Sequence, residues 1–431
     1  MDFAQLLDYI IIACVGGLGS ILANRGIAVF NDGLRPIMPE YLEGKITRRE
    51  LAATSFALSF GLVIGFGIPI SIGTTIIVAH SILLAADIIG TWTPNNKWGT
   101  VLAGGIGALY SIGVMIGLQF VVDLFAMLPV DFLGSLGSIA GPVFVAFAVF
   151  PAIAVAYQHG FLKGIVAFII TFVAYLLVAK FGTFNVAGSK LSLSPEGMSL
   201  MVAMLVMIGF AMTKKGDGSG ANTSLLSIFA ERVTRIRKNW IWLALMGGFI
   251  ACASSLLIVA VDVLPHQLMN KGEYNEAAIA TIARAIGFIP LVFSTAIVTG
   301  VYGMAGTTMV FGIGLLLREH PVLAFFAGAL CMYLEVILLA TITKGLDKFP
   351  GIRDMGEHIR SSMTKVIEIA LLIGSAIACN MIAPSIGYFW LIGFYLLNRT
   401  AKKPIVDLAV GPIATILLGV LVNILHVLGM I

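Results

Sequence analysis

Charged residues are scarce in this chain. Asp, Glu, Lys and Arg make up 11% of its 431 residues, against about 25% in an average soluble domain. Hydrophobic residues make up 59%, and the mean hydropathy is +1.02. Composition therefore indicates a chain that lies mostly in a lipid bilayer. The net charge of +4 is spread over separate loops, so it does not indicate a nucleic-acid-binding face.

Catalytic and metal-binding patterns are also lacking. The chain has no HExxH, no paired Asp motif, no nucleotide-binding loop and no Cys or His at metal-ligand spacing. Its cysteines lie inside apolar runs and read as small buried hydrophobes, at Cys14, Cys252, Cys331 and Cys379. We therefore expect no metal, no cofactor and no enzymatic activity, and ATP-driven transport would need another chain.

The cationic residues that are present are clustered. Nineteen of the 26 Lys and Arg residues lie in four windows, 24–50, 214–238, 344–365 and 398–403. Cationic loops remain on the cytoplasmic side of a membrane, so each window predicts a cytoplasmic loop.

Apolar runs between these windows predict membrane-spanning helices, because about 20 apolar residues cross the hydrocarbon core. Candidate spans lie near 6–23, 51–71, 73–91, 101–125, 140–158, 161–181, 197–213, 239–264, 279–300, 302–317, 321–343, 364–384, 385–397 and 405–428. Several are short, so we expect about 12 ± 2 crossings. Six, four and two candidates separate successive windows, and these even numbers place both termini outside.

The fold expected is an all-α transmembrane bundle with broken or re-entrant segments. The window at 214–238 contains a Gly-rich linker and a basic amphipathic helix. It divides the chain into an N-terminal membrane half, 1–213, and a C-terminal half, 239–431. Weak repetition favours duplicated halves: Ile64–Pro69 followed by Gly73-Thr74-Thr75 resembles Ile286–Pro290 followed by Gly306-Thr307-Thr308. Duplicated halves are common in transporters, although chance explains such matches equally well.

Three apolar segments contain helix breakers. They are 68–75, with Thr74 and Thr75; 128–138, with Asp131; and 304–308, with Thr307 and Thr308. Broken backbone at membrane depth must be buried in protein or line a wet cavity, where it is available to a polar solute. A turn at the membrane surface is the equal alternative for each segment.

Ionisable groups inside apolar runs are costly and therefore indicate function. His80 and Asp87 lie two helical turns apart and are expected on one face. Arg284 and Asp262 are expected to pair at the outer rim, for a structural or a functional reason. Glu335 is the deepest acid; proton coupling, substrate contact and a plain interhelical hydrogen bond all remain open. Glu368 follows Lys365 by three residues, so an ordinary ion pair explains it.

Several strings resemble the YhfT family of bacterial inner-membrane proteins. They are Asn31–Pro36 with Thr47–Glu50, Leu128–Gly137, Phe229–Asn239, and Arg284–Leu291 with Thr299–Tyr302. The resemblance spans nearly the whole chain and implies a permease-like role in the bacterial inner membrane. It carries over no catalytic or substrate residue. The metabolic enzymes that usually accompany the family suggest a small polar metabolite as the substrate.

The function expected is transport of a small polar, perhaps anionic, metabolite by alternating access, driven by an ion gradient. Asp87, Asp131, Arg284 and Glu335, with His80 and the Gly-Thr-Thr segments, are the candidate substrate or coupling residues. A phosphotransferase-type channel subunit that works with soluble partner proteins is the alternative. A membrane enzyme or a scaffold subunit is less favoured. A homodimer is expected only from the habit of such permeases.

Overall fold

The computed structural model describes residues 3–31, 34–63, 67–68, 71, 76–130, 132, 135–136, 138–186, 189–193, 195–214, 222–346, 350–402, 404–405 and 407–430. Its α-helices are α1 (Phe3–Asn24), α2 (Met38–Leu42), α3 (Arg48–Leu62), α5 (Ala79–Trp92), α6 (Lys97–Ala126), α8 (Ala140–Ala146), α9 (Phe150–His159), α10 (Phe161–Phe181), α11 (Pro195–Thr213), α12 (Asn222–Lys238), α13 (Trp240–Ser255), α14 (Val263–Asn270), α15 (Tyr274–Thr299), α16 (Met304–Leu316), α17 (Pro321–Leu346), α18 (Pro350–Ile382), α19 (Ile386–Thr400) and α20 (Asp407–Val427). Its 3₁₀ turns are Arg35–Ile37 and Phe147–Val149, and its strands are β1 (Ile77–Val78), β2 (Thr183–Val186), β3 (Ser189–Ser192) and β4 (Val259–Ala260).

The helices have the length and apolarity of membrane spans. Seven stretches within α1, α6, α10, α11, α17, α18 and α20 are long and apolar enough to cross a bilayer, and α5, α13 and α16 are shorter apolar helices. On α10, large apolar side chains are exposed along the length of the helix, from Leu162 to Phe181. An apolar exterior of this kind suits contact with lipid. The chain is therefore an all-α, multi-pass membrane protein.

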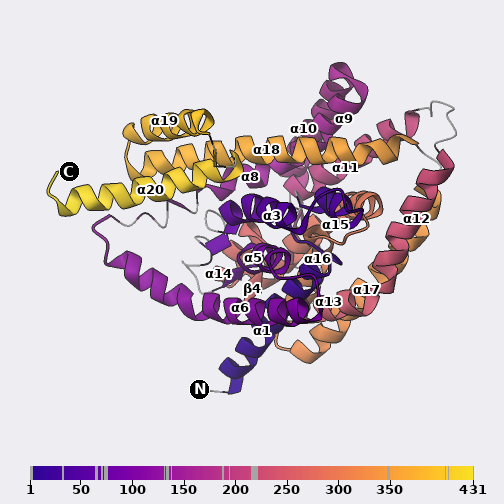
Figure 1. Cartoon of the computed structure of the whole chain (residues 1–431), viewed down its shortest axis with the longest axis horizontal. Helices are drawn as coiled ribbons and strands as arrows, with labels where there is room; N and C mark the ends of the chain where they lie inside the picture. The colour runs from indigo at the N-terminus through magenta and orange to yellow at the C-terminus, as the bar shows by residue number, and fades with distance from the viewer. Residues whose placement is uncertain are drawn as a thin grey trace.

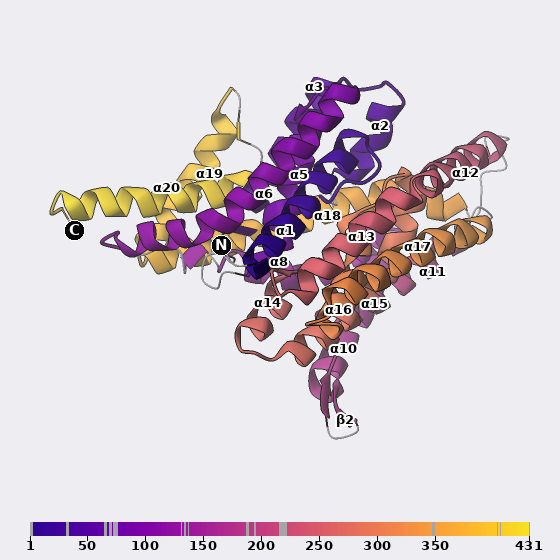
Figure 2. The ribbon, with the colours of Figure 1, turned by 90° about the horizontal axis from the view of Figure 1, so that it is seen from below.

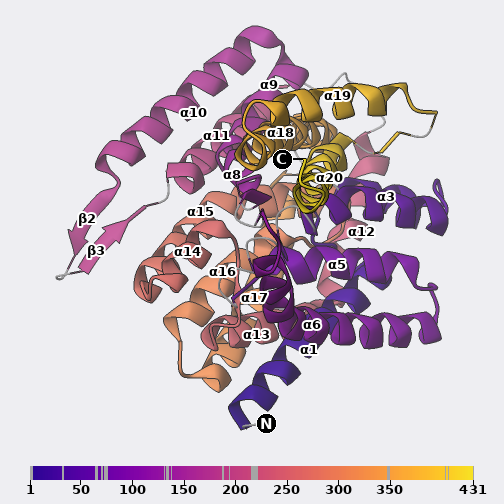
Figure 3. The same cartoon turned by 90° about the vertical axis from the view of Figure 1, so that its left-hand side faces the viewer.

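The helices form two layers (Figure 3). One layer contains α8 to α11 together with α18 to α20, and the other contains α1, α5, α6, α13, α16 and α17. Helices α3 and α15 lie between them: α3 packs on α5 and α20, and α15 packs on α16 and α11. Helix α12 runs along one edge beside α17 (Figure 1), and α12 is the helix expected in the cationic linker.

Two short backbone pairings join segments that are far apart in the sequence. Strand β1 pairs in parallel with β4, so that Ile77 lies opposite Val259. A single bridge joins Ala28 to Tyr302. Each pairing lies directly before a helix: β1 precedes α5, and Tyr302 precedes α16. The extended residues satisfy each other's backbone groups, which is how helix interruptions are tolerated inside a membrane protein.

Glycines lie at two helix crossings of the layer that contains α1 and α13. Figure 2 shows α1 beside α6 and α13 beside α17. A Cβ on Gly107 of α6 would lie 2.5 Å from the Gly16 carbonyl of α1. A Cβ on Gly247 of α13 would lie 2.8 Å from the Gly328 carbonyl of α17. Small residues let helix backbones approach in this way, so α1 packs on α6 as α13 packs on α17.

One expected helix break lies elsewhere. Residues 304–308 are helical and open α16, whereas the interruption precedes them: α15 ends at Gly300, whose φ is +68°, and Gly303 is the extended N-cap of α16. The two glycines take the turn, so Thr307 and Thr308 are free to continue as helix. Residues 72–75 and Asp131 of the other two expected breaks lie outside the described residues.

Candidate functional site

A cluster of ionisable side chains lies where β1 meets β4. Arg284 of α15 places its Nε 2.9 Å from an Asp262 carboxylate oxygen, and the side chains are 16% and 3% exposed. His80, in the first turn of α5, hydrogen-bonds the Val261 carbonyl beside Asp262 and lies within electrostatic reach of Arg284. The expected Asp262–Arg284 pair therefore forms, with Asp262 buried and Arg284 largely covered by protein.

The surroundings of Arg284 hold its side chain in place. The guanidinium carbon lies 5.0 Å from the centre of the Phe288 ring, a cation–π contact. Helix α11 packs directly on the backbone of this residue, because a Cβ at Gly197 would lie 2.9 Å from the Arg284 Cα. His266 Nε2 lies 3.1 Å from the Ile76 carbonyl on the other side of β1. Both halves of the chain thus contribute to one cluster, which we call the β-seam cluster: His80, Asp262 and Arg284.

Asp87 has a different role from His80, although the two lie on one helix. It is fully buried, and its carboxylate accepts hydrogen bonds from the backbone N–H groups of Phe30 and Asn31, at 2.7 to 2.9 Å. These residues follow the Ala28 bridge directly. Asp87 therefore anchors the extended segment to α5, and a carboxylate that accepts backbone donors is satisfied even when buried.

Glu335 lies at the second pairing. Its carboxyl is beside the Tyr302 hydroxyl, and an oxygen of each side chain lies against Gly306 in the first turn of α16. Tyr302 is also the residue whose backbone pairs with Ala28. The fully buried Arg35 packs its guanidinium against Gly303, the N-cap of the same helix. The deepest acid is therefore in contact with the backbone pairing that joins the halves.

A cavity of about 450 Å³ opens beside Glu335. It lies between α15, α16 and α17, and Glu335 is the single ionisable residue of its lining apart from the Cys331 thiol. Leu330, Leu334 and Leu338 of the lining are about half exposed on α17. The cavity therefore reaches the apolar outer surface of the bundle, with one carboxyl group at its inner end.

The remaining candidate residues have no described contact with the β-seam cluster or with Glu335. Thr307 and Thr308 are buried in α16, and the Thr307 hydroxyl donates to the Met304 carbonyl at 2.8 Å. Such a bond within the helix satisfies the hydroxyl locally. Thr74, Thr75 and Asp131 lie outside the described residues.

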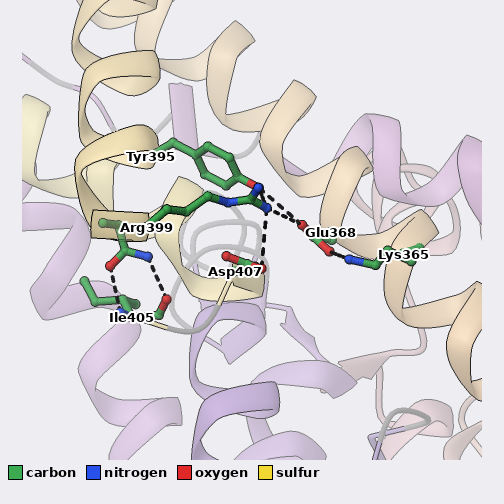
Figure 4. Close-up of polar contacts among 7 residues, drawn as sticks. Lys365, Glu368, Tyr395, Arg399, Ile405 and Asp407 are labelled. Atoms are coloured by element: carbon green, nitrogen blue, oxygen red, sulfur yellow. Dashed lines mark hydrogen bonds and ion pairs between the residues drawn. The ribbon is translucent and has the colours of Figure 1, made fainter. Parts of the chain in front are cut away.

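Glu368 belongs to a separate network that joins the middle of α18 to the end of α19 and the start of α20 (Figure 4). It pairs with Lys365 at 2.9 Å, as expected from their spacing, and also accepts from the Tyr395 hydroxyl at 3.2 Å. Arg399 reaches both Glu368, at 3.4 Å, and Asp407, at 3.7 Å. These contacts fasten three helices of one layer together, so we assign the network a structural role.

Sequence reasoning missed Arg35, Asn31, Ser59 and Tyr302. Asn31 donates to the Ser59 hydroxyl at 3.1 Å between the Ala28 segment and α3. Arg35 and Asn31 lie in a cationic window, where they read as ordinary loop residues. Only the Asn31-Asp-Gly-Leu-Arg-Pro36 string marked them, without indicating that Arg35 and Asn31 are buried. Within the part of the chain that the structure describes, no group of His, Cys, Asp and Glu is arranged to hold a metal.

The sequence matches one protein family over nearly its whole length. The model of the YhfT family, described as a protein of unknown function, matches residues 8–431. The chain is 34% identical over 441 residues to "Uncharacterized protein YhfT" of Escherichia coli (strain K12), and the match covers 98% of both chains. No solved structure matches. The family match over nearly the whole chain shows that this multi-pass membrane protein belongs to the YhfT family.

Proposed function

We propose that this protein is a transporter for a small polar solute and works by alternating access in the bacterial inner membrane. The observation that carries the proposal is the pair of interrupted crossings at β1–β4 and Ala28–Tyr302. Both interruptions lie among buried ionisable side chains, and transporter folds commonly place their sites at such interruptions. A bundle built only as a scaffold has no need to retain buried charges at depth.

The proposed mechanism includes two halves of opposite orientation. Helix α1 is followed by a bridge residue, then by a helix (α3), a second bridge segment, a short helix (α5) and a long helix (α6). In the second half, α13, α15, α16 and α17 follow one another in the same order as α1, α3, α5 and α6. The cationic window 24–50 follows α1, whereas the window 214–238 precedes α13. The two helices therefore cross the membrane in opposite senses, as in inverted repeats.

The two layers supply parts that can move against each other. The layer of α8 to α11 and α18 to α20 meets the other layer where α11 packs on α15 and where α20 packs on α3. In inverted-repeat transporters, one bundle rocks against the other around a site between them. We propose the same motion here, with about 12 ± 2 crossings, N-terminal half 1–213 and C-terminal half 239–431.

Glu335 is our candidate for ion coupling. Its carboxyl touches Tyr302, whose backbone makes the Ala28 pairing, so protonation there acts directly on a contact between the halves. An acid at this depth must be protonated, paired or supplied with donors. The proposal therefore includes a proton as the coupling ion.

Solute uptake by proteoliposomes that contain only this chain tests the proposal. Radiolabelled polar metabolites, grouped by charge, are offered with and without an inward proton gradient. We expect accumulation of at least one charge class above protein-free liposomes, and a larger accumulation with the gradient. Equal uptake in protein-containing and protein-free liposomes for every class contradicts transport by the chain alone, and it then favours a role that requires soluble partners.

A further inference from the structure

We propose that the β-seam cluster, His80 with Asp262 and Arg284, binds an oxyanion group of the transported solute, either a carboxylate or a phosphate. The inference rests on the proposed transport function and deepens it. Three observations carry it: the residue-by-residue correspondence of the two halves, the uncharged counterpart of the ion pair in the first half, and the nitrogen-bearing side chains of Arg284 and His80 gathered beside β1 and β4.

The backbone pairings fix the correspondence between halves. Ala28 of the first half pairs with Tyr302 of the second, and Ile77 of the first half pairs with Val259 of the second. If the two pairings are equivalent, Ala28 corresponds to Val259 and Ile77 corresponds to Tyr302. The offset is 231 residues for the first correspondence and 225 for the second. The difference of six residues falls in the connection before α3, which includes α2 in the first half.

Close contacts elsewhere follow the first offset on α1 and α13, and the second offset to within one residue on α5 and α16, because Gly90 and Gly314 are 224 residues apart. A Cβ on Gly90 of α5 would meet the Ser20 carbonyl and the Ala23 side chain of α1. A Cβ on Gly314 of α16 would meet the Ala251 carbonyl and the Ser254 side chain of α13. Ser20 and Ala23 lie 231 residues before Ala251 and Ser254. The crossings of α1 with α5 and of α13 with α16 are therefore equivalent.

The turns between later helices continue the second offset. Gly160, between α9 and α10, has a φ of +91°, and Ser385, between α18 and α19, has a φ of +66°. These residues are 225 positions apart. A positive φ is uncommon for serine, so its occurrence at the position equivalent to a glycine is a specific agreement. The correspondence thus extends from the layer that contains α1 and α13 into the layer that contains α9, α10, α18 and α19.

Under this correspondence the Asp262–Arg284 pair has a neutral counterpart. Asn31 is equivalent to Asp262 at the first offset, and Ser59 is equivalent to Arg284 at the second. The two counterparts also touch: Asn31 Nδ2 donates to Ser59 Oγ at 3.1 Å, as Arg284 Nε contacts Asp262 at 2.9 Å. In the first half, an amide–hydroxyl hydrogen bond therefore joins the loop at Asn31 to α3.

A buried ion pair is a costly way to make the equivalent contact between the loop at Asp262 and α15. Removing two charges from water costs more than the attraction between them commonly returns, and uncharged replacements are often equally stable. In the first half the contact between the loop and α3 is uncharged, and the buried charge of Asp87 holds the same loop to α5 instead. Charge on Asp262 and Arg284 therefore has a purpose beyond joining the loop to α15, and ligand binding is the purpose that fits an interrupted crossing.

The chemistry of the side chains in the cluster selects the ligand. Asp262 balances Arg284, and His80 adds a donor-bearing ring in the first turn of α5, near the positive end of that helix dipole. The residue equivalent to His80 in the second half is Ala305. Arg284 presents a planar fork of donors that suits carboxylate and phosphate oxygens. An oxyanion is thus favoured over a cation, and Asp262 orients the guanidinium that receives it.

The correspondence itself supplies the test. Asp262→Asn with Arg284→Ser converts the charged pair into the pair that already works in the first half, so the fold is expected to be retained. Thermal unfolding of the purified full chain is measured with inorganic phosphate, with lactate and with choline, at constant ionic strength. We expect phosphate or lactate to raise the unfolding temperature of the unaltered protein by several degrees. Choline is expected to have no effect, and the double variant is expected to show no shift with any of the three.

Arg284→Lys covers the case in which the double variant fails to fold. It keeps the charge but loses the fork, so we expect a smaller shift with the same anion and no new response to choline. A shift that persists in the double variant, an equal shift with choline, or no anion shift in the unaltered protein overturns the inference. Uptake measurements separate the two proposals. If the protein binds the anion but shows no uptake, the transport function is contradicted and the binding site is not. If the double variant shows the same uptake as the unaltered protein, the binding site is contradicted and the transport function is not.

Discussion

Buried polar side chains in this protein mainly hold backbone in place. Asp87 accepts from Phe30 and Asn31, and Asn24 donates to the Gly90 carbonyl and the Thr93 hydroxyl. Unpaired polar backbone costs several kcal/mol in lipid, on the order of its cost in an apolar solvent. Extended segments between helices are therefore accompanied by side chains that supply the missing partners.

Asp87→Asn is expected to destabilise the protein by about 1–3 kcal/mol, because the new amide group presents a donor to the backbone donors of Phe30 and Asn31. Thermal unfolding in detergent measures the loss. Asp407→Asn is the matched control: Asp407 is 41% exposed and lies 3.7 Å from Arg399, so its loss is expected to be within about 0.5 kcal/mol. Equal losses in the two variants contradict the anchoring role of Asp87.

Glu335→Gln keeps the shape of the side chain and removes the titratable group. If Glu335 couples transport to protons, uptake driven by a proton gradient is expected to fall at least tenfold, while exchange of labelled for unlabelled solute continues. Glu276→Gln, at an exposed position in the first turn of α15, is the control and should leave both processes unchanged. Proton-driven uptake that survives in Glu335→Gln excludes this residue as the coupling group.

Helix contacts in the second layer depend on which face of each helix carries its glycines. Gly107 and Gly105 are two positions apart on α6, yet a Cβ on Gly107 would meet Gly16 and Ser20 whereas one on Gly105 would meet no atom within 4 Å. The sequence shows many glycines, but it does not show which of them lie at a crossing.

Gly107→Ala is accordingly expected to be destabilising by about 1–3 kcal/mol through overpacking against α1. Gly105→Ala is expected to be neutral or slightly stabilising, because alanine is the better helix former. Unfolding temperatures of the two variants, measured side by side in the same detergent, check this difference. A loss at Gly105 as large as that at Gly107 would contradict the α1–α6 crossing.

Helix α12 is tied to the first half by charge. Arg232 lies 2.8 Å from Glu43, and Arg235 donates to the Gly26 carbonyl. Hydrogen bonds and charges from Lys45 and Arg232 lower the pKa of Glu43 below its ordinary value of 4.5. Because that pKa is lowered on folding, the contact is stabilising above the ordinary value and is lost as pH falls through the lowered value.

Hydrogen exchange of the 230–238 part of α12 checks this pH dependence. After correction for intrinsic rates, exchange is expected to accelerate only when the pH falls below the ordinary pKa of Glu43. Glu43→Gln is expected to exchange faster than the unaltered protein at neutral pH and to show no further change on acidification. Acceleration at mildly acidic pH, well above that value, would point to a different group.

At the scale of the molecule, residues 1–213 and 239–431 share one bundle, and each part contributes helices to both layers (Figure 3). We propose that the orientation of the helices follows from the cationic windows, with the loops at Lys45 and Arg232 inside and the turns at Lys271 and Glu319 outside.

Labelling of single cysteines in a background without the four native cysteines tests this topology. A membrane-impermeant maleimide applied to intact spheroplasts is expected to label Lys271→Cys and Glu319→Cys, and to label Lys45→Cys only after the membrane is opened. The reverse pattern inverts the whole assignment, whereas one discordant site would change the number of crossings.

Patterns of charge and hydropathy were sufficient to predict the helical membrane class, the cationic linker helix and the approximate position of most long helices, but not α2, α14 or the first part of α18. Even the short runs at 302–317 and 385–397 correspond to helices, α16 and α19. The helix break at 304–308 was placed too late, because Gly300 and Gly303 take the turn before α16. The Asp262–Arg284 pair was predicted, but its burial was not, since depth depends on the α11 packing that covers Arg284.

The sequence by itself determined that the chain lies in a membrane, because scarce charge and long apolar runs leave few alternatives, and it marked the cytoplasmic loops through clustered Lys and Arg. Only the tertiary structure decided how the halves correspond. The strings that repeat in the sequence do not follow the spacing of the Ala28–Tyr302 and Ile77–Val259 pairings. The physical reason is that backbone hydrogen bonds and glycine contacts define the correspondence, and neither requires identical side chains at equivalent positions.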